Sequence, residues 1–353
     1  MLSRVANSLY WMSRYVERAE NTVRLVDVNL QLMLDFRNQD DRAVIEHWLP
    51  IVQSTGDEER FGVLHPKATG PAVTEFLVFQ ADNPNSIVSS ITQARENARM
   101  VRDQVSADVW EELNRLYLFL HSSRSRELWE NSPHEFFSEI KASSLQLHGL
   151  TDTTQVRNEG WFFVQAGRYL ERADKTSRLV DVWHASVPDR GAASQASQQA
   201  SLSWSAVLRS SSAWDAYRAL HGAEVQPMLV ADFLLLSEDF PRSVRFCVQQ
   251  LNAALRRISG VSEGRFTNEA EKHSGRLLAE LQYSTIADIF DEGLHAYLDR
   301  FQDKLNTIGN ALFQTYISQH FHTLADREFH QQEEQQQQMK AIVRAAPSFN
   351  PLR

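Results

Sequence analysis

Hydrophobic residues recur at intervals of three and four along most of the chain. The first such segment, Ser3–Phe36, contains no Gly or Pro, which predicts a helix that is buried along one stripe. The same periodicity covers residues 87–120, 135–150, 159–184, 243–258 and 274–322. Alternation with a period of two, which indicates strands, is nearly absent. The pattern therefore predicts an all-α fold in which long helices pack as a bundle.

The N-terminal helix has a second copy further along the chain. MSRYVERAENTVRLVDV (residues 12–28) and AGRYLERADKTSRLVDV (166–182) are identical at eleven of seventeen positions. Two weaker matches follow in the same order, WLPIVQSTG with WSAVLRSSS and FLVFQADNPNSI with FLLLSEDFPRSV. We predict a pseudo-symmetric tandem duplication. It gives one helical domain, 1–325, with units at about 1–150 and about 155–325, and the Gln-rich segment 326–353 as a disordered tail.

The composition and charge of the chain exclude several classes of protein. With 42% hydrophobic and 10% aromatic residues, the chain can build a large core, and global disorder is excluded. A net charge of −9, with both signs dispersed, argues against nucleic-acid binding through basic patches. The single cysteine, Cys247, fits a reducing compartment. Neither a secretory signal nor an apolar run of about 18 residues is found. We therefore predict a cytoplasmic protein that binds neither nucleic acid nor membrane.

Each copy of the repeated helix carries an Arg–Glu–Arg ladder at positions i, i+3 and i+10. The ladders are Arg14, Glu17 and Arg24 in the first copy and Arg168, Glu171 and Arg178 in the second. Arg18 and Arg172 lie on their flanks. On a helix these positions share a sector of about 80° that borders the apolar stripe. We expect them to be half-buried where the two helices pair.

Three interpretations of these charges are open. They could form a solvated face, because Glu20–Arg24 and Asp174–Arg178 have the i, i+4 spacing of exposed ion pairs worth about 0.2–0.5 kcal/mol each. They could form a buried network that bridges the two copies. They could also bind a ligand, because the ladder is kept while neighbouring positions differ. In that case Glu17 and Glu171 are candidate acid–base residues, and the ladder arginines bind an anion.

A second group of arginines occurs in SITQARENARMVRDQ, residues 90–104. Arg95, Arg99 and Arg102 share one helical face, with Asn97 beside them. They repel one another unless carboxylates or an anion neutralise them, and Arg forks suit carboxylate or phosphate groups. An anionic small molecule or peptide would do so, and so would Glu17 or Glu171 across the bundle.

Motifs for self-sufficient catalysis are absent from the sequence. It contains no G-x-x-x-x-G-K-[ST], G-x-G-x-x-G or H-E-x-x-H, so no usual nucleotide loop or zinc site is present. One E-x-x-H occurs, Glu292–His295, whereas a helical di-iron site needs two with two further Glu. We predict no metal and no cofactor.

Four segments resemble the alpha-E domain family, a bacterial all-helical group named for its Glu-Arg motif. They are LYWMSRYVERAENTVRLVDV, NPNSIVSSITQARENARMVRDQVSADVWEELN, GWFFVQAGRYLERADKTSRLVDV and FLLLSEDFPRSVRFCV. The resemblance implies that Glu17–Arg18 and Glu171–Arg172 occupy the Glu-Arg motif, and that Arg95, Asn97 and Arg99 occupy a second one. Ser237 departs from the pattern, because an acidic residue is expected there.

The resemblance also implies partners. Alpha-E proteins are encoded beside, or fused to, circularly permuted ATP-grasp proteins, often with a transglutaminase-like protein nearby. The association with these proteins implies ATP-dependent formation of amide or peptide bonds. We therefore expect an accessory or substrate-binding subunit of such a ligation system. The alternatives are an independent enzyme that uses the Arg-flanked Glu residues as acid and base, and a non-catalytic structural bundle.

Overall fold

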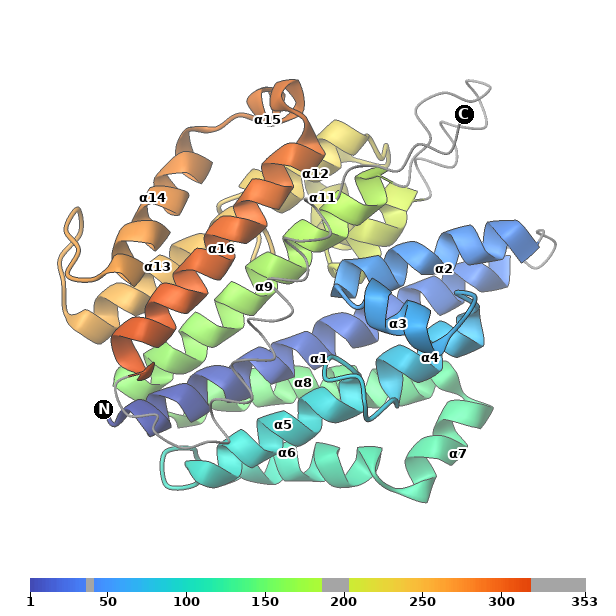
Figure 1. The fold of residues 1–353 in the computed structure, drawn as a ribbon, viewed down its shortest axis with the longest axis horizontal. Helices are drawn as coiled ribbons and strands as arrows, with labels where there is room; N and C mark the ends of the chain where they lie inside the picture. The colour runs from blue at the N-terminus through green and yellow to red at the C-terminus, as the bar shows by residue number, and fades with distance from the viewer. Residues whose placement is uncertain (36–40, 186–202, 319–353) are drawn as a thin grey trace.

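The computed structural model describes residues 1–35, 41–185 and 203–318 (Figure 1). Every regular element within these ranges is a helix, which confirms the all-α prediction. No helix among them is long and apolar enough to cross a membrane. The predicted tail, 326–353, lies outside the described residues, and the division into two units stays a prediction.

Two long helices form the centre of the molecule. α1 (Ser3–Asp35) and α9 (Glu159–Ala185) contain the two copies of the repeated segment and pack against each other (Figure 1). Their apolar stripes are buried, as the periodicity predicts; Ala19 and Ala173, for example, have no exposed surface.

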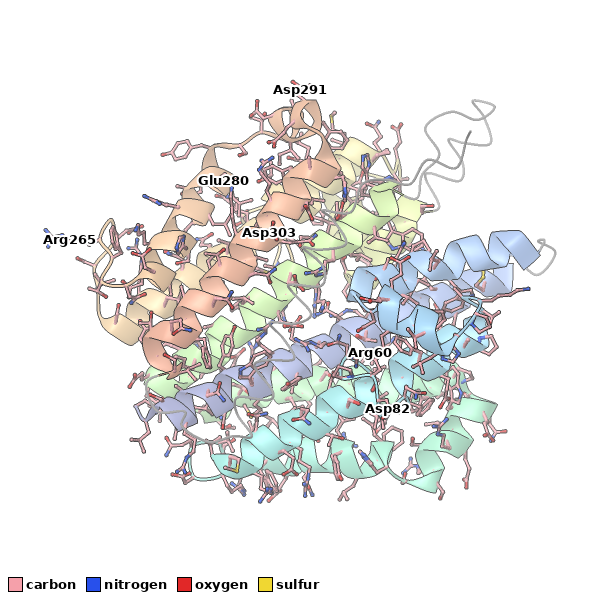
Figure 2. All side chains as sticks on the ribbon, viewed as in Figure 1. Arg60, Asp82, Arg265, Glu280, Asp291 and Asp303 are labelled. Carbon is pink, nitrogen blue, oxygen red and sulfur yellow. The ribbon has the colours of Figure 1, made fainter. Side chains whose placement is uncertain are left out.

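α1 belongs to a bundle formed by the first half of the chain. It packs against α5 (Ile87–Met100) and α8 (Pro133–Thr154), and both contact α6 (Ala107–Leu120). The shorter helices of this half are α2 (Asp41–Thr55), α3 (Glu58–Leu64), α4 (Gly70–Val78) and α7 (Ser123–Asn131). Arg60 of α3 donates a hydrogen bond to the backbone oxygen of Asp82 at 2.8 Å, which ties α3 to the turn before α5 (Figure 2).

α9 belongs to a bundle formed by the second half. It packs against α13 (Val244–Ser259) and α16 (Leu294–Tyr316), and both contact α14 (Glu269–Tyr283). The shorter helices are α11 (Trp214–His221), α12 (Pro227–Leu236) and α15 (Ile286–Glu292), and residues 203–210 are also helical. The neighbours of α9 thus follow the same order as those of α1.

Two segments that we predicted as continuous helices are interrupted. Residues 87–120 form α5 and α6, because Ser106 accepts a hydrogen bond from the Val109 backbone and starts a new helix. Residues 274–322 contain the end of α14, then α15 and α16. Thr285 and Asp288 form a capping box at α15, and Gly293 adopts a φ of 100° between α15 and α16. The apolar periodicity continues across these breaks, so it cannot locate them, whereas caps do.

The two central helices approach each other closely near their N-terminal ends. A Cβ at Gly167 of α9 would lie 2.3 Å from the backbone oxygen of Tyr10. The equivalent residue of α1, Ser13, donates a hydrogen bond from Oγ to the Val164 backbone oxygen at 2.7 Å. Glycine at 167 therefore permits the backbone contact that brings the charged positions of both helices together.

Candidate functional site

Glu171 of α9 is held by cations from α1. Its Oε2 accepts a hydrogen bond from Arg14 Nε at 2.7 Å, and its Oε1 accepts one from Arg18 Nε at 2.7 Å. Lys175 Nζ lies 3.8 Å from Oε1. The Glu171 side chain is fully buried. Burial by itself would raise its pKa, but Arg18 and Arg14 lower that pKa to about 2. The carboxylate is therefore ionised at neutral pH.

Glu17 of α1 makes the reciprocal contact. Arg172 of α9 donates from Nε to Glu17 Oε1 at 2.8 Å and from Nη2 to Oε2 at 2.7 Å. Arg242, in the turn before α13, donates to Oε1 at 3.1 Å. Burial opposes ionisation of Glu17, yet Arg172 and Arg242 hold its pKa well below the usual value.

Glu20 lies one turn further along α1 and shares these partners. Arg242 Nη2 donates to its Oε1 at 2.7 Å, and Arg24 pairs with the same oxygen. His148 Nε2 of α8 lies 3.0 Å from Glu20 Oε2 and 3.3 Å from Glu17 Oε2. Burial and the neighbouring Arg24 lower the pKa of Arg242 to about 10. Glu20 and Glu17 therefore do not fully offset its burial and its repulsion from Arg24.

Cations outnumber carboxylates in this network. The cations are Arg14, Arg18, Arg24, Arg172, Lys175, Arg178 and Arg242, and the carboxylates are Glu17, Glu20, Glu171 and Asp174. None of the seven cationic side chains is more than 19% exposed. Buried charge is costly unless it is neutralised. Among the described residues, the cations of this network thus exceed its carboxylates in number.

The burial of these side chains contradicts one of the three interpretations of the charges on the repeated helix. Glu20–Arg24 and Asp174–Arg178 do pair, with Arg178 Nε 2.9 Å from Asp174 Oδ1. All four residues are nevertheless largely buried between helices. The solvated-face interpretation is therefore wrong. The expectation of half-burial was also too low, because the ladder carboxylates have no exposed surface.

The arginines of α5 lie apart from this network. Arg95 donates to Asn114 Oδ1 at 2.8 Å and to Glu96 Oε1 at 2.7 Å, and Arg99 donates to Glu96 Oε2 at 2.8 Å. These partners belong to α5 and α6. The pairing with Glu17 or Glu171 that we considered from the sequence does not occur, because a carboxylate on the same helix is nearer.

The remaining predicted residues are also placed separately. The Arg102 guanidinium lies over the Trp110 ring, 5.4 Å from its centroid. Asn97 donates to a backbone oxygen of its own helix. Arg168, the ladder counterpart of Arg14, is turned away from Glu17 and pairs with Asp152 at 3.2 Å.

Sequence reasoning missed three contributors to the network. Arg242 and Asn85 occupy equivalent positions in the repeated turns FPRS and NPNS, and Asn85 accepts a hydrogen bond from Arg18 at 2.8 Å. The alignment of the two units could therefore have identified both. His148 has no comparable signal, since it is a lone histidine on an amphipathic helix.

Glu17, Glu20 and His148 lie close enough together to suggest a metal site. They offer one ligand atom each within 4.8 Å of one another, a spacing that a metal ion could use. The two carboxylates, however, already bind Arg172 and Arg242. A divalent cation would meet these guanidinium groups at close range and be repelled. The donor set fits an ion-pair network better than a metal centre.

Comparison with known proteins identifies the family. The Alpha-E family model, described as an alpha-helical domain with a conserved ER motif, matches residues 1–317. The chain belongs to the Alpha-E family. Among its relatives are an uncharacterised protein of Mycobacterium bovis and two of Mycobacterium tuberculosis. Each is 26% identical over 316 residues, covering 84% of this chain and 34% of the relative.

This Alpha-E chain thus spans about a third of the length of those relatives. No solved structure matches it. The Glu-Arg pairs Glu17–Arg18 and Glu171–Arg172 lie at the centre of the buried network, each Glu paired with the Arg of the other copy.

Proposed function

We propose that this Alpha-E protein is an accessory or substrate-binding subunit of an ATP-grasp-dependent amide or peptide ligation system. The observation that carries the proposal is the surplus of buried cations along the α1–α9 interface. Seven cations share four carboxylates, so an anionic substrate would find compensating charge there. A carboxylic acid that is to be activated by ATP has this charge.

The geometry supports an accessory role more than direct catalysis by the glutamates. Arg14 and Arg18 engage both oxygens of Glu171, and Arg172 engages both oxygens of Glu17. The nearby arginines also keep both pKa values low despite burial. A general acid needs a proton near neutral pH, and a base needs a free oxygen. We therefore assign Glu17 and Glu171 a positioning role, holding the arginines of the opposite helix.

The length of the relatives supports a partner. The helical domain accounts for about a third of each curated relative, so those chains have room for a catalytic domain in the same polypeptide. We propose a circularly permuted ATP-grasp protein as the partner that supplies this catalytic function, with a transglutaminase-like protein as a second partner. We place the assembly in the cytoplasm.

A non-catalytic structural bundle is the second candidate. It is favoured by the closed, reciprocal form of the Arg18–Glu171 and Arg172–Glu17 pairs. On this alternative the network joins the two halves of the chain and binds nothing else.

The test combines this chain with a circularly permuted ATP-grasp protein from the same organism. Complex formation is measured by size-exclusion chromatography with light scattering, and ATP hydrolysis and amide formation are measured with and without the chain. We expect a stable complex and faster amide formation. A ligase that works at full rate alone and forms no complex would contradict the accessory role and leave the structural bundle.

A matched pair of variants locates the contact. Arg99→Ala removes an arginine of the second predicted motif on α5 that is 58% exposed, and Arg126→Ala removes an arginine that is 49% exposed and pairs with Glu75. We expect the first to weaken the complex and the second to leave it unchanged.

A further inference from the structure

Arginines and aromatic rings alternate where α5 packs against α6. The Arg102 guanidinium lies 5.4 Å from the centroid of the Trp110 ring, and the Arg95 guanidinium lies 5.5 Å from the same centroid. The Arg95 guanidinium is also 4.5 Å from the centroid of the Tyr117 ring. Arg102, Trp110, Arg95 and Tyr117 thus follow one another across the two helices. We name these four residues the cation–aromatic stack.

Helical spacing places the stack on one face of each helix. Arg95 and Arg102 are seven residues apart on α5, with Arg99 between them, and Trp110 and Tyr117 are seven residues apart on α6. Seven residues are close to two helical turns, so each pair shares a face. Both rings are partly buried, whereas Arg99 and Arg102 are exposed. The accessible part of this surface is therefore cationic.

The arginines of this surface have donors to spare. Glu96 accepts a hydrogen bond from Arg95 Nη1 at 2.7 Å and another from Arg99 Nε at 2.8 Å. Arg102 contacts Trp110 but forms no hydrogen bond or ion pair with any other described residue. Three guanidinium groups thus share one carboxylate, although the chain as a whole has a net charge of −9. An acidic group that the rest of the chain repels would be attracted here.

The second half of the chain lacks the stack. In the alignment of the two repeated turns, α13 has Asn252 where α5 has Arg95, and Ser259 where α5 has Arg102. Asn252 is buried and donates a hydrogen bond to Ser274 of α14 at 2.9 Å. A short polar contact is thus enough to join the equivalent helices. The packing of this helix pair does not require exposed arginines, which favours a binding role for them.

The residue types also favour binding to a protein. Trp, Tyr and Arg are the residues that most often dominate the binding energy of protein interfaces. An arginine that lies over an aromatic ring keeps the N–H donors in its own plane available to carboxylates. The exposed edge of the stack therefore combines an apolar ring with charged donors on both sides of it.

We propose that the cation–aromatic stack and Arg99 form a docking surface for an acidic segment of the ATP-grasp partner. Carboxylates of this segment pair with Arg99 and Arg102, and its apolar side chains cover the Trp110 ring. Charge complementarity is the argument for the chemistry of the segment. The inference rests on the proposed function for the identity of the partner only.

The first experiment uses a probe that does not depend on the partner. A fluorescein-labelled decaglutamate peptide is titrated with the full chain, and its fluorescence anisotropy is measured at low and at high salt. We expect the unaltered protein to bind the peptide, and salt to weaken the binding. In Arg99→Gln/Arg102→Gln the affinity should fall about tenfold, because two exposed charged contacts are lost.

Arg209→Gln/Arg218→Gln is the matched control. Both arginines are exposed and lie over the Trp214 ring in the second half, 4.4 and 5.7 Å from its centroid. This variant loses the same charge from a similar setting, so its affinity for the peptide should equal that of the unaltered protein. Thermal unfolding checks that both variants are folded.

The same two variants are then mixed with the ATP-grasp protein, and the dissociation constant is measured by calorimetry. We expect Arg99→Gln/Arg102→Gln to weaken the complex and the control to leave it unchanged. If no complex forms but the peptide still binds through Arg99 and Arg102, the docking surface for an acidic segment is supported and the proposed function fails. The two proposals can thus fail separately.

Three outcomes would overturn the docking surface. One is peptide binding that is absent, or that falls equally in both variants, which would mean general attraction between charges. Another is a complex with the ATP-grasp protein that is as tight in Arg99→Gln/Arg102→Gln as in the unaltered protein, which would leave the proposed function in place. The third is self-association of the chain that this variant abolishes, which would assign the surface to a second copy.

Discussion

Glu17 and Glu171 occupy equivalent positions in the repeated helix, yet the two halves of the molecule hold them differently. Glu171 is held by Arg18 through both oxygens and by Arg14, which comes from the same helix, α1. Glu17 is held by Arg172 through both oxygens and by Arg242 from a turn outside the two helices. Both halves share the reciprocal Glu-Arg pair. They differ in the further cations that contact each Glu.

The likeness of the two halves extends to the packing of their helices, and the tandem duplication stays a prediction. α1 packs on α5 and α8, which share α6, and α9 packs on α13 and α16, which share α14. Ser86 and Ser243 cap the equivalent helices α5 and α13 in the same way. The equivalent arginines differ in their partners, because Arg14 pairs with Glu171 of the opposite helix whereas Arg168 pairs with Asp152. Substituting the equivalent residue in one half at a time therefore distinguishes the contacts that both halves share from those that differ.

The largest effect is expected from Glu17→Gln. It leaves Arg172 buried without its carboxylate and Arg242 with Glu20 as its remaining partner, which costs about 3–5 kcal/mol. Glu171→Gln should cost less, because its partner Arg14 is 17% exposed whereas Arg172 is 9% exposed, and water can reach Arg14 more easily. Urea unfolding at pH 7 measures both. Equal losses would mean that the two halves are energetically alike.

Acid should remove the contribution of Glu171, which comparison with Glu171→Gln isolates from that of the other carboxylates. Its folded-state pKa of about 2 lies below the ordinary 4.5, so the ionised group stabilises the fold above pH 4.5. This contribution, about 3 kcal/mol, is lost as the pH falls from about 4.5 to about 2. The difference in unfolding free energy between the unaltered protein and Glu171→Gln should shrink across this window. A constant difference would contradict the assignment.

Gly167→Ala tests the close approach of the two helices. The added Cβ would lie 2.3 Å from the Tyr10 backbone oxygen, so the helices must shift. We expect a loss of about 1–3 kcal/mol, although alanine favours helix. Ser13→Ala at the equivalent position removes only one hydrogen bond, about 1 kcal/mol. Thermal unfolding compares the two, and an alanine at 167 that is tolerated as well as one at 13 would refute the close approach.

Arg242→Asn makes the second half resemble the first, where Asn85 holds this position. It removes one partner each from Glu17 and Glu20 but also relieves repulsion from Arg24. We expect a loss of about 1–2 kcal/mol in urea unfolding, well below that of Glu17→Gln. A loss as large as that of Glu17→Gln would show that Arg242, and not Arg172, is the main partner.

The smallest effect on stability is expected from Arg99→Ala. The side chain is 58% exposed and pairs with a partly exposed Glu96, so the loss should be within about 0.5 kcal/mol. The same variant is expected to weaken the complex with the ATP-grasp protein. Loss of the complex without loss of stability would place binding on α5, outside the buried network.

The sequence predicted the helices where periodicity is long and uninterrupted. Residues 3–36 and 159–184 correspond closely to α1 and α9, because a long apolar stripe of period 3.6 without Pro favours one continuous helix. The breaks at Ser106 and Gly293 were missed, since the apolar pattern runs through them.

The candidate site was predicted in part. Repetition singled out Glu17, Glu171 and the arginines beside them, and the structure brings these together. Arg95 and Arg99 were grouped with them by charge alone, and they pair locally with Glu96 instead. His148 and Arg242 reach Glu17 from separate elements. The repeated turn marks the position of Arg242, but no sequence pattern marks His148.

The amino-acid sequence by itself determined the all-helical fold, the family and the two repeated Glu-Arg pairs, because helical periodicity and a long repeated segment are local properties of the chain. Only the tertiary structure decided which charges meet and how deeply they are buried. Helix periodicity specifies which face a side chain occupies but not what packs against that face. The pairing of Arg172 with Glu17, and the separation of Arg168 from it, depend on how α1, α8 and α9 cross.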